Sequence, residues 1–218
     1  MIRNLKSFAL AFVAVLAMSA VVSSVAQAVP SYTCSAYPCT ATGANPPGNE
    51  TLTTPGGSLA CSTHYLVEKY KGTNEGITAP ASQVTVTGGY GECTAFGFLS
   101  AMIAFNGCDF VFTATEKLAI GRYAHHVDIV CPDGKSITKT AGTCEVDIPA
   151  QAGLTSATTQ NLSNGSITLE LNMKEITLNV TKDGFGCPFA GTGHVKGTYH
   201  GDVVLSRIGG GSLAVSGE

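Results

Sequence analysis

Apolar and polar residues alternate along much of the chain, which is the pattern of β-strands with one buried face. The alternation is strict over residues 167–173 and resumes over residues 176–180 on the opposite parity. A slip of one residue would move the apolar side chains to the other face of a sheet. The change of phase at Lys174 and Glu175 therefore predicts a β-bulge or a turn.

The dipeptide Asn106-Gly107 separates two apolar runs, residues 99–105 and residues 108–113. Both of its residues tolerate the positive φ of a type I′ turn. The spacing predicts a hairpin in which Phe105 pairs with Cys108 and which is apolar on both faces.

A second turn signal, Pro132-Asp133-Gly134, lies between residues 125–131 and residues 135–140. It predicts a type I turn with Gly134 in the left-handed region. Helical periodicity is weak: the best candidate, residues 114–124, is limited by Gly121 to one or two turns. About eight to eleven short strands at this spacing predict an all-β domain, an antiparallel β-sandwich or a partly closed barrel.

Residues 86–96 and residues 180–189 resemble each other. Each segment has Val-Thr at the end of a predicted strand, a Gly-aromatic-Gly turn, a Cys and a nearby Phe. Two explanations stay open: duplication of a β unit, or chance recurrence of glycine-rich turns beside cysteine.

Residues 1–28 have the order of a secretory signal peptide. Arg3 and Lys6 precede an apolar stretch, and Ala26-Gln27-Ala28 presents small residues at a cleavage site. The apolar stretch of about 15 residues is shorter than the roughly 20 that span a bilayer, so a cleaved leader is expected rather than an anchor. Secretion to the extracellular space or the cell surface follows.

Loss of the leader removes two positive charges, so the formal net charge changes from −3 to −5. A mildly acidic chain without a Lys/Arg cluster has no electrostatic footprint for nucleic acid or for an anionic membrane. Neither is expected as a partner of the mature chain. A cell-wall component, an extracellular glycan or a protein stays open as a partner.

The composition shifts along the chain predict four parts. Residues 1–28 form the leader, and residues 29–58, rich in Pro, Gly and Thr, form an N-terminal arm with a loop between Cys34 and Cys39. Residues 59–207 form the β domain, and residues 208–218 a flexible tail.

All eight cysteines follow the leader: Cys34, Cys39, Cys61, Cys93, Cys108, Cys131, Cys144 and Cys187. An even number of cysteines in an exported chain predicts up to four disulfides. The C-x-x-C spacing that is typical of a zinc site does not occur, so zinc is not expected. Two local pairs are predicted, Cys34 with Cys39 and Cys131 with Cys144, because each encloses a turn-prone loop. The other four cysteines stay unassigned.

No motif identifies a catalytic residue, a cofactor site or a metal site. The histidines are His64, His125, His126, His194 and His200. Adjacent His125 and His126 point to opposite faces of a strand, and His194, His200 and Asp202 are interpreted as solvent-facing positions. The Gly-x-Ser-x-Gly elbow of hydrolases and the clustered acids of calcium loops are absent.

Sugar binding has some support from tyrosines, which stack on sugar rings when exposed. The candidates are Tyr65, Tyr70, Tyr90, Tyr123 and Tyr199. The absence of Trp, the best stacking platform, weighs against this interpretation.

Four motifs carry a resemblance to a known group of proteins: residues 91–98 (GECTAFGF), 106–110 (NGCDF), 130–135 (VCPDGK) and 184–189 (GFGCPF). On these motifs the chain resembles uncharacterised secreted, cysteine-containing β proteins of soil actinobacteria, over roughly residues 50–205. The group has no assigned activity, so the resemblance implies location and covalent framework alone.

The leader, the cysteines and the lack of a catalytic motif favour a secreted, non-enzymatic β protein with a structural or adhesive role. The first alternative is a module that binds a small molecule or a glycan. The second is a hydrolase whose site is assembled from distant residues.

Overall fold

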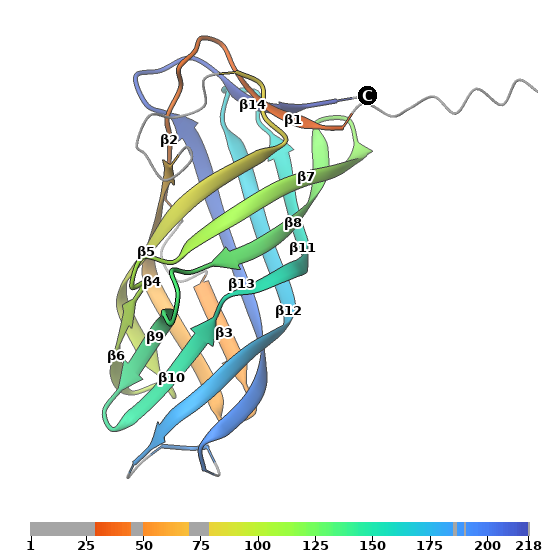
Figure 1. The fold of residues 1–218 in the computed structure, drawn as a ribbon. Helices are drawn as coiled ribbons and strands as arrows, with labels where there is room; N and C mark the ends of the chain where they lie inside the picture. The colour runs from red at the N-terminus through yellow and green to blue at the C-terminus, as the bar shows by residue number, and fades with distance from the viewer. Residues whose placement is uncertain (1–28, 45–49, 70–78, 185–186, 190, 218) are drawn as a thin grey trace, which may run out of the picture.

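The computed structural model describes residues 29–44, 50–69, 79–184, 187–189 and 191–217, and of residues 44 and 63–69 the backbone alone. The leader predicted over residues 1–28 lies outside this part. Within it the chain forms strands and turns (Figure 1), and no helix that could cross a membrane is found there. The strands are β1 Ser31–Cys34, β2 Ala41–Ala44, β3 Glu50–Thr54, β4 Gly57–Lys69, β5 Gln83–Ala95, β6 Leu99–Ala104, β7 Asp109–Ala119, β8 Arg122–Val130, β9 Ser136–Ala141, β10 Cys144–Pro149, β11 Gln151–Asn161, β12 Ile167–Asp183, β13 Gly193–Arg207 and β14 Leu213–Ser216.

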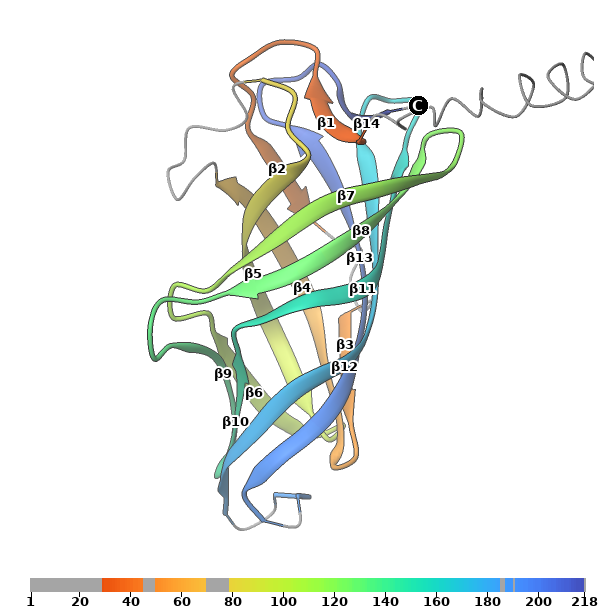
Figure 2. The ribbon, with the colours of Figure 1, turned by 45° about the vertical axis from the view of Figure 1, so that its right-hand side comes forward.

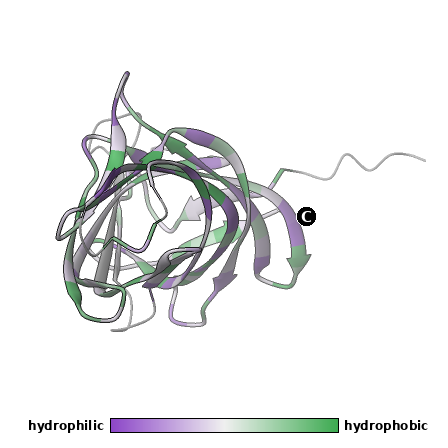
Figure 3. Ribbon diagram, turned by 90° about the horizontal axis from the view of Figure 1, so that it is seen from below, coloured by the Kyte–Doolittle hydropathy of each residue, from purple (hydrophilic) through white to green (hydrophobic). Residues whose placement is uncertain are grey.

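The strands close into an antiparallel barrel, which confirms the predicted all-β class. One closed ring follows the order β5-β7-β8-β11-β12-β13-β2-β4, and β4 pairs again with β5. Seen from below, the strands surround a central axis (Figure 3). We call this ring the upper ring, since its strands occupy the upper part of Figure 1.

A second ring of eight strands closes below the first. Its order is β4-β5-β6-β9-β10-β12-β13-β3, and β3 pairs again with β4. The two rings share β4, β5, β12 and β13, which are 13, 13, 17 and 15 residues long. The barrel is thus one long tube in which four strands run through and the other four are replaced halfway (Figure 2).

The Asn106-Gly107 turn forms, but the predicted hairpin is wrong. Both residues have positive φ, 53° and 86°, and the Cys108 amide donates to the Phe105 carbonyl at 2.8 Å. The strands on either side do not pair, because β6 and β7 follow one another along the same edge of β5. The turn carries the chain from the lower ring to the upper ring.

The second predicted turn carries the chain back. The Lys135 amide donates to the Pro132 carbonyl at 2.9 Å, and Gly134 has a φ of 68°, as expected. β8 before it belongs to the upper ring and β9 after it to the lower ring. Both strong turn signals therefore mark passages between rings.

The helix predicted over residues 114–124 is wrong. β7 and β8 pair across this segment, and Gly121, with a φ of 67°, lies in the turn between them. The pairing of β7 with β8 overrides the weak local preference for a helix. The predicted bulge in β12 is confirmed: the register shifts between Met173 and Ile176, and Glu175 has a φ of 60°.

Four disulfides join the eight cysteines: Cys34–Cys39, Cys61–Cys93, Cys108–Cys131 and Cys144–Cys187. The predicted Cys34–Cys39 pair is confirmed, and the predicted pairing of Cys131 with Cys144 is wrong. Cys131 follows β8, beside the start of β7 and therefore beside Cys108. Such a framework is typical of extracellular proteins.

The segments predicted as an arm and a flexible tail are parts of the folded body. Residues 29–58 supply β1, β2 and β3, and two of these strands complete the barrel rings. Residues 208–218 supply β14, which pairs with β1, and Leu213 and Val215 are buried in the core. β1, β2, β3 and β14 are each four or five residues long, and alternation of apolar and polar residues over so few positions does not predict a strand.

Side-chain amides complete the pairing at both ends of β11. Gln151 Oε1 accepts from the Thr177 amide at 2.9 Å, and Gln151 Nε2 donates to the Thr177 carbonyl at 3.1 Å. Asn161 binds the amide and the carbonyl of Val215 in the same way. Each side-chain amide of β11 thus supplies the hydrogen bonds that a neighbouring strand would otherwise give to β12 or β14.

We expect Gln151→Ala to lower the free energy of unfolding by about 1–3 kcal/mol, since hydrogen bonds to partly buried backbone are lost at the ring junction. Chemical denaturation with the disulfides intact measures the change. Thr155→Ala, at an exposed position of the same strand, is the control and is expected to stay within about 0.5 kcal/mol. Equal effects of the two substitutions would contradict the role assigned to Gln151.

Candidate functional site

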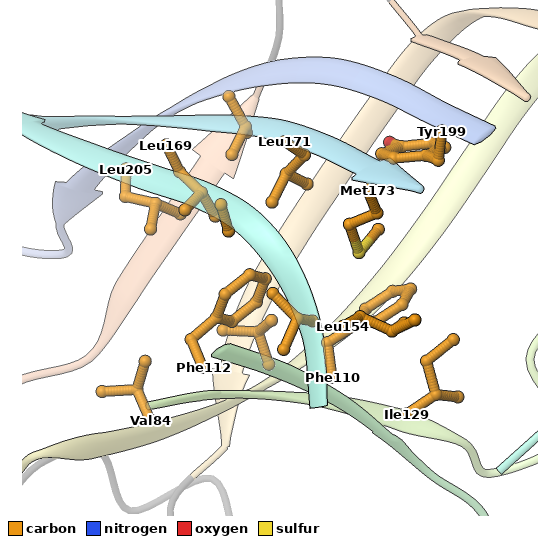
Figure 4. Close-up of a cluster of buried hydrophobic side chains, with 14 of the residues drawn as sticks. Val84, Phe110, Phe112, Ile129, Leu154, Leu169, Leu171, Met173, Tyr199 and Leu205 are labelled. Atoms are coloured by element: carbon orange, nitrogen blue, oxygen red, sulfur yellow. The ribbon is translucent and has the colours of Figure 1, made fainter. Parts of the chain in front are cut away.

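Large side chains fill the barrel in the region of the upper ring. Phenylalanines from β7 meet leucines from β11, β12 and β13 (Figure 4). The labelled members are Val84, Phe110, Phe112, Ile129, Leu154, Leu169, Leu171, Met173, Tyr199 and Leu205. This half of the barrel is a packed core.

His125 lies in this core and is fully buried. Its Nδ1 lies 3.0 Å from the Tyr32 hydroxyl and its Nε2 lies 2.8 Å from Thr159 Oγ1. Burial lowers its pKa to about 4, so the imidazole is neutral at neutral pH and both nitrogens have partners. These contacts are those of a structural histidine.

The other sequence candidates do not gather into a site. His126, His194 and His200 are exposed, and the side chain of His64 lies outside the described part. His125 and His126 face opposite ways, as predicted. In the described ranges no three His, Cys, Asp or Glu side chains are placed to share a metal ion.

The tyrosines considered for sugar binding are not exposed platforms. Tyr123 and Tyr199 are buried, and Tyr90 is half-buried between Phe105 and Tyr199. Tyr70 and the side chain of Tyr65 lie outside the described part. Because inward positions of a barrel alternate with outward ones, a tyrosine in the apolar phase of a strand points into the barrel.

Small side chains lie among larger ones on the inner wall of the lower ring, and part of the space inside it is empty. Ala95, Ala141 and Cys144 contribute to the wall of a cavity whose empty space is about 420 Å³, its open mouth included. The centres of water-sized molecules fit within about 40 Å³ of this space, which is room for about three waters. We call it the outer cavity.

An inner cavity lies toward the upper ring, where Tyr90, Phe110, Met173 and Tyr199 contribute to its wall, and its empty space is about 350 Å³ with its opening to solvent included. The centres of water-sized molecules fit within about 30 Å³ of it. The two cavities share Leu52 and Lys139 as lining residues.

Lys139 is the basic residue that both cavities share. It follows Ile137 in the inward phase of β9 and is 9% exposed. Among the described residues no hydrogen bond or ion pair reaches its amine, and burial lowers its pKa to about 7. An amine without a charged partner in apolar surroundings is the kind of perturbed group that marks functional sites.

The sequence analysis missed Lys139, although the signal was present. Ile137, Lys139 and Ala141 share one parity, so the lysine stands in the apolar phase of a strand. A charged residue in that phase is directed into the barrel.

A chain of hydroxyl groups lies across the inner cavity from β9. Tyr90 donates to the Tyr199 hydroxyl at 2.9 Å, and Tyr199 donates to Glu50 Oε2. Glu50 is buried, and Gly201 leaves room for its carboxylate, because a Cβ at position 201 would overlap Oε2 of Glu50. Burial and the charge of Glu50 raise the pKa of Tyr90, so its phenol stays protonated.

Two aromatic rings stand at the mouth of the outer cavity. Phe96 and Phe189 make an edge-to-face contact with ring centroids 6.5 Å apart. Phe96 lies against Gly57 and Phe189 against Gly56. The Cys144–Cys187 disulfide ties the chain next to Phe189 to β10, so the mouth has an apolar rim held by a covalent bond.

We expect Lys139→Met to raise the free energy of unfolding at pH 7 by a few kcal/mol. The folded-state pKa of about 7 lies below the ordinary 10.5, so between these values the unfolded chain binds the proton that the folded chain releases. The advantage of the methionine variant is therefore largest at pH 7 and below and shrinks by about 1.4 kcal/mol per pH unit above it.

Denaturation at pH 7, 8 and 9 under non-reducing conditions measures this difference. Lys135→Met, at the exposed turn before the same strand, is the matched control and should show no such trend. Parallel stability profiles for the wild type and Lys139→Met would contradict the burial of an unpaired amine.

No family model, curated protein or solved structure matches the chain. The resemblance to secreted actinobacterial β proteins therefore stays a prediction, and the function has to be inferred from the barrel itself.

Proposed function

We propose that the chain is a secreted binding protein that encloses a small, mainly apolar molecule in the lower half of its barrel. The observation that carries this proposal is the pair of cavities that meet at Lys139, inside a closed ring of eight strands. Eight-stranded barrels have an interior that side chains either fill or leave open for one small ligand. In this barrel Phe112, Leu169 and Leu205 pack the upper half, and the two cavities that meet at Lys139 lie below them.

The walls specify the kind of ligand. Apolar side chains with a few polar groups are the usual lining of small-molecule sites. In the inner cavity the polar groups among the described lining residues are the amine of Lys139 and the hydroxyls of Tyr90 and Tyr199. A short hydrocarbon chain with one uncharged polar end fits this lining.

Secretion is supported by the leader predicted over residues 1–28 and by the disulfides, which form and persist in oxidising compartments. The structural or adhesive role expected from the sequence stays a prediction. The hydrolase alternative gains no support from the described histidines: the side-chain partners of His125 and His200 are Tyr32, Thr159 and Asn172, none of them an acid.

We expect 1-hexanol to bind the mature chain, residues 29–218, with a dissociation constant of about 1 mM or below. Ala141→Leu fills the outer cavity from β9, and it should weaken binding at least about tenfold, which isothermal titration calorimetry measures.

Ala104→Leu makes the same change at an exposed position of the neighbouring strand β6 and is expected to leave binding unchanged. Circular dichroism confirms that both variants are folded. No heat of binding in the wild type, or equal binding by Ala141→Leu, would refute the cavity as the site.

A further inference from the structure

We propose that Lys139 captures a small aliphatic aldehyde inside the barrel by forming an imine with it. The proposal rests on the proposed function, because it names the reactive class of ligand for the same cavities. It assigns the amine a covalent role in holding that ligand.

The surroundings of the amine favour an uncharged reactant. In the part of the chain that the structure describes, the titratable groups that line the two cavities are Lys139, Tyr90 and Tyr199. The buried carboxylate nearest to them, Glu50, accepts the hydrogen bond of Tyr199. Among the described residues no acidic side chain lines either cavity with Lys139, so the ammonium form has no partner there that would offset the cost of burying its charge.

Burial also makes this amine a better nucleophile than the exposed lysines. The nucleophile is the unprotonated amine. With a pKa of about 7, roughly half of Lys139 is unprotonated at pH 7. An ordinary lysine with a pKa near 10.4 has about one amine in 2,500 in this form.

A carboxylate ligand is the main competitor, and the site disfavours it. Its charge would have to leave water together with the charge of Lys139, and the desolvation of two ions offsets much of their attraction. An aldehyde enters uncharged and meets an uncharged amine. The apolar wall contacts the hydrocarbon chain of a carboxylate and of an aldehyde alike. The head group therefore decides which of the two ligands the site favours.

The chemistry balances without another reactant. The lone pair of Nζ forms a bond to the carbonyl carbon, and one amine hydrogen moves to the carbonyl oxygen to give a carbinolamine. The C–O bond then breaks as the C=N bond forms, and the oxygen leaves as water with both hydrogens of the amine. Water reverses this step, and the hydrocarbon chain of the bound aldehyde favours the imine by displacing water from the apolar cavity.

The test is reductive trapping. The disulfide-intact mature chain is incubated at pH 7 with hexanal and sodium cyanoborohydride, which reduces the imine to a stable hexyl-lysine. Intact mass and peptide mapping should show one hexyl group per chain at Lys139, formed at least about tenfold faster than at the exposed Lys135. The rate should increase between pH 6 and pH 8 as the amine loses its proton.

Three variants make the result specific. Lys139→Met should remove the fast labelling, Lys135→Arg should leave it unchanged, and Ala141→Leu should slow it by blocking the cavity. Labelling spread over exposed lysines, or fast labelling that persists in Lys139→Met or Ala141→Leu, would overturn the proposal. Hexanoate that binds more tightly than hexanol and blocks labelling would replace the imine by an ion pair and overturn it as well.

The outcome separates the two proposals. If hexanol binds and hexanal does not label Lys139, the binding function stands and imine formation is refuted. If neither molecule engages the cavity, both are refuted.

Discussion

Every backbone donor and acceptor of a barrel wall needs a partner, and this chain must meet that requirement while four of its strands are exchanged halfway along the tube. Four long strands run through both rings, and their edges change partner at the junction. β12 pairs with β11 as far as Leu171 and with β10 from Asn179. Between these points the strand bulges at Glu175, and the amide of Gln151 binds Thr177 in place of a neighbouring strand. The closed wall depends on such local substitutes.

The junction also divides the interior into two parts with different roles. Inward positions in the upper ring carry Phe112, Leu169 and Leu205, which fill the space. Inward positions in the lower ring include Ala95 and Ala141, and side chains of this size cannot reach across a ring of the same strand number. A packed core in one half fixes the wall, so the other half can stay open without collapsing.

Local sequence signals predicted local geometry and failed on partners. The turns at Asn106-Gly107 and at Gly134 form, and the bulge at Glu175 lies where the apolar phase changes. The hairpin beside the first turn does not form, because pairing with β5 and β9 decides where β6 lies.

The cysteines follow the same rule. The pair that closes a short loop, Cys34–Cys39, was predictable from spacing, whereas Cys108–Cys131 depends on the pairing of β7 with β8. Lys139 was readable from the parity of β9. Glu50 was not, since it begins a short strand after a stretch rich in Pro and Gly, and its position depends on the glycine at 201.

Among the described residues, the upper half of the barrel buries His125 and the lower half buries Lys139, and the contrast between them argues for different purposes. His125 has a hydroxyl group at each ring nitrogen and is neutral over the physiological range, so it adds order to the core at little cost. Lys139 has no such partner and lowers stability at and below neutral pH, where an apolar side chain of similar length would not. Disulfides on both sides of the cavity, Cys61–Cys93 and Cys144–Cys187, stabilise the wall by restricting the unfolded chain. That covalent support lets the lower ring retain an open space and a reactive amine at once, a combination that a barrel selected for stability alone would not keep.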